Sequence, residues 1–288
     1  MLRFIQLLVL LSAAACGAPH SATVVEGEAP QRIISLDFCA DQYVLKFVER
    51  DHILALSPDA RKPFSYMREA AKGIDTVRPF VENILILEPD LVVRSYGGGP
   101  DAARLIERAG VPVLNVGWAG DIEGIKRVTR GMATGLGVPE KGEALVAEID
   151  ARLATIEEHV ASRAARGDAI PEALYVTPSG TTSGSGSFIH EMLTIAGLDN
   201  FQKQAGWRSI PLERLAYEEP DMVATAFFDT HMASNGVWSA MRHPIARKQI
   251  ADHPTVHLKG DVMSCGAWFA MDGIEALAFA PQEVGGGL

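Results

Sequence analysis

Apolar runs and amphipathic stretches alternate along the chain, and this alternation predicts its elements. In the first half, short runs of mostly β-branched apolar residues, typical of buried strands, lie at 32–36, 52–56, 91–93 and 111–116. Stretches with apolar residues at helical spacing lie between some of them, at Ala40–Glu49 and Asp101–Ala109. Strands and helices in alternation indicate a parallel sheet with helices on both faces.

A long amphipathic stretch interrupts this pattern between Pro139 and about Arg166. Apolar residues recur there at three- and four-residue spacing, and Gly142 near the start is the only residue that disfavours a helix. Proline is well tolerated at the first helical position, and Gly167 is a typical stop signal. The predicted helix is on the order of 40 Å long. Its charged opposite face is typical of a connector.

The strand and helix pattern then starts again. Strands are predicted at 173–176 and 221–225, with a loop rich in Gly, Ser and Thr at 177–187 and a helix at Phe188–Ala196. The sequence therefore predicts an α/β protein of two lobes, each a mostly parallel sheet flanked by helices, with a ligand cleft between them. The expected N-terminal lobe covers 30–137, the bridging helix 138–167 and the C-terminal lobe 168–288. A rigid connector predicts closure by only a few degrees.

The first 22 residues are typical of an export signal and linker. Arg3 precedes a short apolar run, Phe4–Leu11, and small residues then lead to Cys16. The run is too short to span a bilayer as a mature helix. Cleavage before Cys16 would give a lipidated protein, and ordinary cleavage near Ala22 would give an unanchored one. Both alternatives place the mature chain in the periplasm.

Charge and cysteine content narrow the possible functions. The formal net charge is -10 without a run of Lys or Arg, which argues against a nucleic-acid ligand. An acidic surface suits docking to a basic site on another protein. Cys39 and Cys265 either form one bridge or remain two buried thiols. No Cys/His cluster has the spacing of a zinc site.

Two segments of the chain, 81–92 and 212–223, repeat one pattern. Each has a glutamate, a short amphipathic helix, Glu-Pro-Asp and then an apolar strand. Glu82 and Glu213 therefore lie at matching places in the first turn of a helix. Acidic residues there are favoured by the helix dipole alone. As a matched pair, they also fit a partner with two equivalent arginine pockets.

Several motifs together resemble one family, the periplasmic proteins that bind vitamin B12 and iron-siderophore complexes. The resemblance covers residues 32–269 and is carried by 32–36, 81–92, 109–113, 182–184 and 197–200. It implies a monomer that has no cofactor of its own and delivers a metal chelate to an inner-membrane ABC permease and its ATPase. It also implies that Glu82 and Glu213 meet permease arginines. Arg94–Gly98 and the pair Trp268–Phe269 are most similar to the vitamin B12-binding members.

Aromatic residues gather at the predicted strand ends, where parallel sheets bind ligands. Large flat side chains cover a macrocycle or hydroxamate chelate at low entropic cost. The predicted ligand-binding residues are Phe38, Tyr66, Tyr96, Trp118, Ser183, Phe228, Trp268 and Phe269. Packing between the lobes is the alternative role for each aromatic residue. Arg94 and Arg208 either pair with a negative group on the ligand or are solvated surface arginines.

Three other functions compete with chelate binding. A haem receptor could use Tyr66 or Tyr96 as an axial ligand. A bare-metal receptor needs converging His and carboxylate ligands from both lobes, which the sequence does not indicate. An enzyme is not expected, because the Ser/Gly stretch 183–187 lacks the Gly-x-Ser-x-Gly pattern and phosphate-binding loop motifs are absent.

Overall fold

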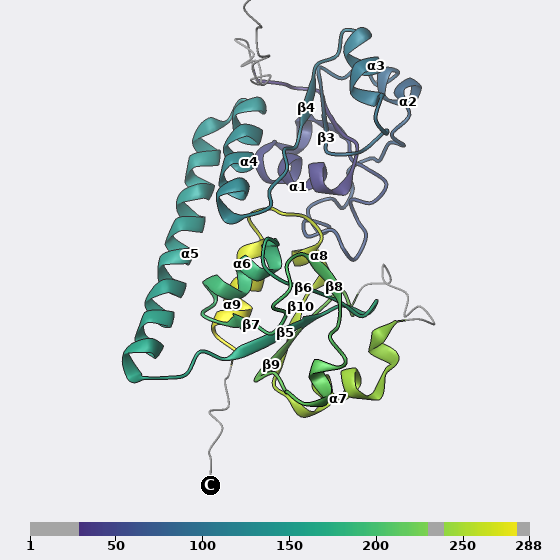
Figure 1. Ribbon diagram of the computed structural model, residues 1–288. Coiled ribbons are helices and arrows are strands. Elements are labelled where there is room, and N and C mark those ends of the chain that lie inside the picture. The colour runs from purple at the N-terminus through teal and green to yellow at the C-terminus, as the bar shows by residue number, and fades with distance from the viewer. Residues whose placement is uncertain (1–28, 230–238, 281–288) are drawn as a thin grey trace, which may run out of the picture.

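The computed structural model describes residues 29–229 and 239–280, which form two stacked lobes with one long helix along their side (Figure 1). The predicted leader and the predicted lipidation of Cys16 lie outside the described residues. Within them, no helix is long and apolar enough to cross a membrane.

The N-terminal lobe is built on a four-stranded parallel sheet of order β2-β1-β3-β4. Its strands are β1 (Ile33–Ser35), β2 (Ile53–Ala55), β3 (Leu91–Arg94) and β4 (Val113–Asn115). Its helices are α1 (Phe38–Phe47), η1 (Arg50–His52), α2 (Val81–Leu85), α3 (Ala102–Arg108) and α4 (Ile122–Gly135). The predicted strands and helices of this lobe are confirmed to within a few residues, and α4 was not predicted.

Helix α5 (Pro139–Arg166) begins and ends where the sequence predicted. Gly167 closes it in the left-handed region, at φ 79°. Gly142 is required by packing, because a Cβ there would lie 2.5 Å from Cβ of Ala133 in α4. The apolar face of α5 is buried against α4 and, further along, against α9 of the other lobe. The connector is thus part of the core as well as a link.

The C-terminal lobe repeats the architecture with a parallel sheet of order β10-β9-β5-β7. Its strands are β5 (Glu172–Val176), β7 (Asp199–Asn200), β9 (Met222–Ala226) and β10 (Thr255–Leu258). Its helices are α6 (Phe188–Ile195), η2 (Arg214–Ala216), η3 (Ala240–Arg242), α7 (Pro244–Asp252), α8 (Gly260–Met263) and α9 (Ala270–Ala278). The predicted loop 177–187 contains a strand, β6 (Thr181–Ser183), which pairs with β8 (Trp207–Ser209).

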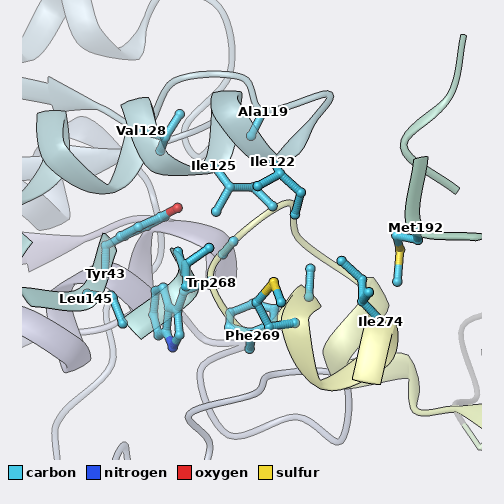
Figure 2. Close-up of a cluster of buried hydrophobic side chains, with 14 of the residues drawn as sticks. Tyr43, Ala119, Ile122, Ile125, Val128, Leu145, Met192, Trp268, Phe269 and Ile274 are labelled. Carbon is cyan, nitrogen blue, oxygen red and sulfur yellow. The ribbon is translucent and has the colours of Figure 1, made fainter. Parts of the chain in front are cut away.

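The lobes share one hydrophobic core. Figure 2 shows Trp268 and Phe269 of the C-terminal lobe beside Tyr43 of α1 and Leu145 of α5. The ring of Trp268 meets that of Tyr43 edge-on at 5.2 Å. Burying aromatic side chains between the lobes contributes strongly to stability and opposes wide opening.

Candidate functional site

The carboxyl ends of both sheets face each other where the lobes meet. Cys39, shortly after β1, forms a disulfide with Cys265, beyond β10 and α8, with their Cα atoms 5.8 Å apart. The sequence left this pairing open. In addition, Arg68 Nη1 lies 2.5 Å from a carboxylate oxygen of Asp261 in α8, so a covalent bond and an ion pair cross between the lobes.

On the N-terminal lobe, one buried carboxylate holds the loop that follows β3. Asp37 caps α1 by accepting from the backbone N–H of Ala40 at 3.0 Å. Its second oxygen accepts from the backbone N–H groups of Ser95, Tyr96 and Gly97 at 2.6, 3.0 and 2.9 Å. A carboxylate that accepts several N–H bonds fixes the backbone that donates them. The position of Tyr96 is therefore set before any ligand arrives.

Arg94 holds the same loop from its other side. Its Nε donates to the carbonyl of Gly97 at 2.8 Å and its Nη2 to the carbonyl of Gly99 at 2.9 Å. The side chain is buried, so it does not offer a charge to a ligand. Gly97 must lack a side chain, since a Cβ would lie 2.4 Å from the carbonyl oxygen of Leu36. The structure thus gives Arg94 a structural role in place of the predicted contact with an anionic ligand.

Three aromatic rings form a surface at these strand ends, which we call the N-lobe wall: Phe38, Phe64 and Tyr96. Phe38 lies edge-on between the other two, 4.9 Å from Phe64 and 6.2 Å from Tyr96. Tyr96 is 54% exposed, and its hydroxyl has no hydrogen-bond partner among the described residues. Burial and the nearby Asp37 carboxylate raise the pKa of the Tyr96 phenol. The wall thus offers a ring face and a neutral hydroxyl.

Three other predicted contact residues lie in the interface between the lobes. Trp268 and Phe269 are 5% and 1% exposed. Tyr66 stacks on Phe269 with ring centroids 4.4 Å apart, and its hydroxyl donates to Asp272 at 2.8 Å. Burial and this bond raise the pKa of Tyr66 to about 12. These residues match the alternative role of packing between the lobes, so we leave them out of the proposed ligand surface.

The C-terminal lobe supplies a different surface, which we call the C-lobe wall: the hydroxyls of Thr177, Ser179 and Thr181 beyond β5, and Phe228 beyond β9. Thr177 Oγ1 lies 2.8 Å from Ser179 Oγ and 2.6 Å from Thr181 Oγ1. Phe228 is partly exposed. Ser183, a predicted ligand-binding residue at the end of β6, is fully buried. The wall offers hydroxyls and one ring.

A pocket of about 280 Å³ opens at the ends of β9 and β10. The described residues that line it are Thr225, Phe228, Asp229, His257, Leu258 and Lys259. His257 Nδ1 lies 2.7 Å from Thr225 Oγ1, and the two residues are paired across the strands. The sequence indicated His257 only as one of several histidines weighed for a bare-metal site, and it did not indicate Lys259, although both lie at or just beyond the end of a strand.

Trp118, the last of the predicted contact residues, lies beyond β4 and is almost fully exposed. The structure therefore leaves Tyr96, Trp118 and Phe228 as the predicted side chains with open surface, with Phe38 supporting Tyr96. No group of three or more His, Cys, Asp or Glu side chains among the described residues is placed to hold a metal ion.

Two parallel α/β lobes joined by a single long helix, with strand ends facing each other, define a two-lobed solute-binding protein. The chain belongs to the periplasmic binding protein family, whose model matches residues 43–256. The predicted family and fold class are thereby confirmed. No sequence among the curated proteins matches the chain.

Solved structures show the same fold. A periplasmic haem-binding protein from Pseudomonas aeruginosa is 21% identical, with a TM-score of 0.64 over 88% of this chain and 93% of that one. A possible iron-binding solute-binding protein from Staphylococcus epidermidis is 18% identical, with a TM-score of 0.68 over 87% and 98%. The periplasmic vitamin B12-binding protein of Vibrio cholerae is 19% identical, with a TM-score of 0.57 over 87% and 96%.

Proposed function

We propose that this chain is the solute-binding component of an ABC importer and captures a bulky metal chelate, a corrinoid or a ferric siderophore, between its lobes. The observation that carries the proposal is the N-lobe wall, where Asp37 and Arg94 hold the loop bearing a half-exposed Tyr96. A prearranged aromatic surface binds a large flat ligand without an ordering cost. Solved structures of this fold include proteins described as binding vitamin B12 or haem.

The proposed role includes docking to the permease through Glu82 and Glu213. Both carboxylates are exposed, and neither has an ion pair or hydrogen bond within the described part of the chain. They are thus available to arginines of a partner in the inner membrane. The expected monomer, the periplasmic location and the absence of enzymatic activity belong to the same proposal.

A titration tests the ligand class. Purified protein is titrated with cyanocobalamin, haemin and a set of ferric hydroxamate and catecholate siderophores, with tryptophan fluorescence and calorimetry as readouts. Trp118 is an exposed reporter at the strand ends, and Trp118→Phe separates its quenching from that of the other three tryptophans. We expect saturable binding of one class with one-to-one stoichiometry. Binding of none of them would refute the proposed ligand class.

Haem is the second candidate, and one observation favours it. Of the two tyrosines that could serve as an axial ligand, Tyr66 already donates a hydrogen bond to Asp272, whereas the Tyr96 hydroxyl is unpaired within the described part. Ligation of ferric iron requires loss of the phenol proton. If haem is the ligand, Tyr96→Phe abolishes the tyrosinate-to-iron absorption band and Tyr66→Phe leaves it intact.

A further inference from the structure

The two repeated segments share a pattern of burial as well as of sequence, although Glu82 lies inside α2 and Glu213, predicted in a first helical turn, directly precedes the three-residue η2. We call them the two corners, 81–90 on the N-terminal lobe and 212–221 on the C-terminal lobe. In each, the apolar residue two places after the glutamate is buried, Ile84 in one and Leu215 in the other. The residue four places after the glutamate is apolar and exposed, Ile86 at 80% and Tyr217 at 91%. The repeat therefore preserves an exposed apolar residue four places after each glutamate.

A single exposed apolar side chain needs no explanation on a protein surface. Here two of the most exposed large apolar residues occupy equivalent positions on the two lobes.

In the C-terminal corner, the ion pairs leave Glu213 as the glutamate without a partner in the described part of the chain. Glu218 is paired with Arg214 at 2.6 Å, and Glu219 with Lys248 at 2.9 Å. Glu213 has no such partner among the described residues. Of these three glutamates, Glu213, four residues before the exposed Tyr217, is thus the one left for an external cation.

Both corners are firmly attached to their sheets. Asp90 accepts from the backbone N–H groups of Gln31 and Arg32 at 2.8 and 3.0 Å. Asp221, at the equivalent place, accepts from the backbone N–H of Glu172 at 2.7 Å. An interface residue on a rigid support loses less conformational freedom on binding.

The corners also lie on one side of the molecule. Figure 1 shows α2 and α7 on the side away from α5, one on each lobe. The N-terminal corner contains α2, and the C-terminal corner contains η2, which packs against α7. A partner that approaches this side reaches both lobes at once.

We propose that Ile86 and Tyr217 are apolar anchors of the docking interface, and that each enters an apolar pocket beside an arginine on the permease. This inference rests on the proposed transport function and adds the residues that supply affinity. Buried aromatic and aliphatic anchors dominate the binding energy of interfaces, whereas exposed ion pairs mainly set orientation and association rate. The partner is thus a membrane protein with two equivalent sites, each combining a cation and an apolar pocket.

Photo-crosslinking in the native cells identifies the partner. Benzoylphenylalanine is placed at position 86, 217 or 170, where Ile170 is an equally suitable control because it is 71% exposed and lies outside both corners. We expect positions 86 and 217 to link to the same ABC permease subunit and position 170 to link to nothing. Adducts with a second copy of this chain, adducts with lipid alone, or no adduct would each overturn the proposal.

Affinity for that permease in nanodiscs then measures the anchors. We expect Ile86→Ser and Tyr217→Ser each to weaken binding about tenfold or more at every salt concentration, as truncated hot-spot residues do. Glu82→Gln and Glu213→Gln should instead change the salt dependence. Ile170→Ser should change neither. Unchanged affinity for the two anchor variants would refute the inference.

The chelate titration keeps this inference separate from the proposed function. If no chelate binds but positions 86 and 217 still link to a permease, the proposed ligand class fails and the docking anchors stand. If a chelate binds and the anchor variants retain full permease affinity, the proposed ligand class stands and the docking anchors fail. Chelate affinity and thermal midpoint of both anchor variants should equal those of the unsubstituted protein, because neither side chain is part of a core.

Discussion

Two groups of aromatic side chains lie near strand ends in this protein, and they are held in different ways. In the N-lobe wall, Tyr96 is half-exposed and its loop is fixed by hydrogen bonds to Asp37 and Arg94. In the interface between the lobes, Trp268 and Phe269 are buried and fixed by packing. Aromatic residues that the sequence pattern groups together at strand ends are thus open to solvent in one region and packed between the lobes in the other.

The largest effect is expected from a substitution in the packing between the lobes. Phe269→Ala removes a fully buried ring that stacks on Tyr66 and contacts Trp268, and we expect it to lower the free energy of unfolding by about 3–5 kcal/mol. Tyr96→Ala should change that free energy by less than about 1 kcal/mol but weaken chelate binding. Urea denaturation and the chelate titration provide the two readouts. Equal destabilisation by both substitutions would remove the distinction between the regions.

The second prediction concerns the support of the N-lobe wall. Asp37→Ala removes the cap of α1 and leaves three backbone N–H groups without their acceptor, so we expect a loss of about 3 kcal/mol. Chelate affinity should fall too, because Tyr96 is no longer held in place. Asp121→Ala is the matched control, since Asp121 caps α4 with a single bond and its loss should cost about 1 kcal/mol. Similar losses for both variants would contradict the role given to Asp37.

The third prediction is a pH dependence of stability that comes from one buried carboxyl group in α1. Asp41 lies in α1 and accepts from the backbone N–H and the hydroxyl of Ser57 at 3.0 and 2.6 Å. Burial nevertheless raises the pKa of this carboxyl from 3.8 to about 6. The folded state therefore binds the proton more tightly than the unfolded state. The resulting stabilisation is present below pH 4 and is lost as the pH rises through about 6.

The variant Asp41→Asn tests whether stability falls as the pH rises. We expect the free energy of unfolding of the unsubstituted protein to fall by on the order of 2 kcal/mol, relative to the variant, between pH 4 and pH 7. Urea denaturation at a series of pH values gives the comparison. A difference that stays constant with pH, or that grows in the opposite direction, would show that Asp41 does not carry a raised pKa.

The sequence predicted the helices and strands better than it predicted whether the side chains at their ends are exposed or buried. Pro139 and Gly167 set the limits of α5 through local backbone preferences, so they could be read without knowing the fold. Whether Trp268 faces a ligand or a core depends on its contact with Tyr43, more than 200 residues away in the sequence. Strand periodicity carries no information about such contacts.

Arg94 and β6 show the same limit. An arginine after a strand near glycines is compatible with an anion site, and only the carbonyls of Gly97 and Gly99 around its guanidinium reveal a structural role. The stretch Thr181–Ser183 looked like loop because it is short and flanked by glycines, and it is a strand because β8 pairs with it. Both depend on partners that the local pattern does not identify.

The smallest expected effect compares two hydroxyls. Tyr66→Phe removes a 2.8 Å hydrogen bond to Asp272 and keeps the ring that stacks on Phe269. Asp272 remains paired with Arg152 at 2.7 Å, so it is not left unpaired, and we expect a loss of about 1 kcal/mol. Tyr96→Phe removes a hydroxyl without a partner among the described residues and should not change stability. Denaturation of the two variants side by side, with the absorbance of tyrosinate during an alkaline titration, measures both effects. A greater loss of stability for Tyr96→Phe would place the Tyr96 hydroxyl in a structural contact and remove it from the proposed ligand surface.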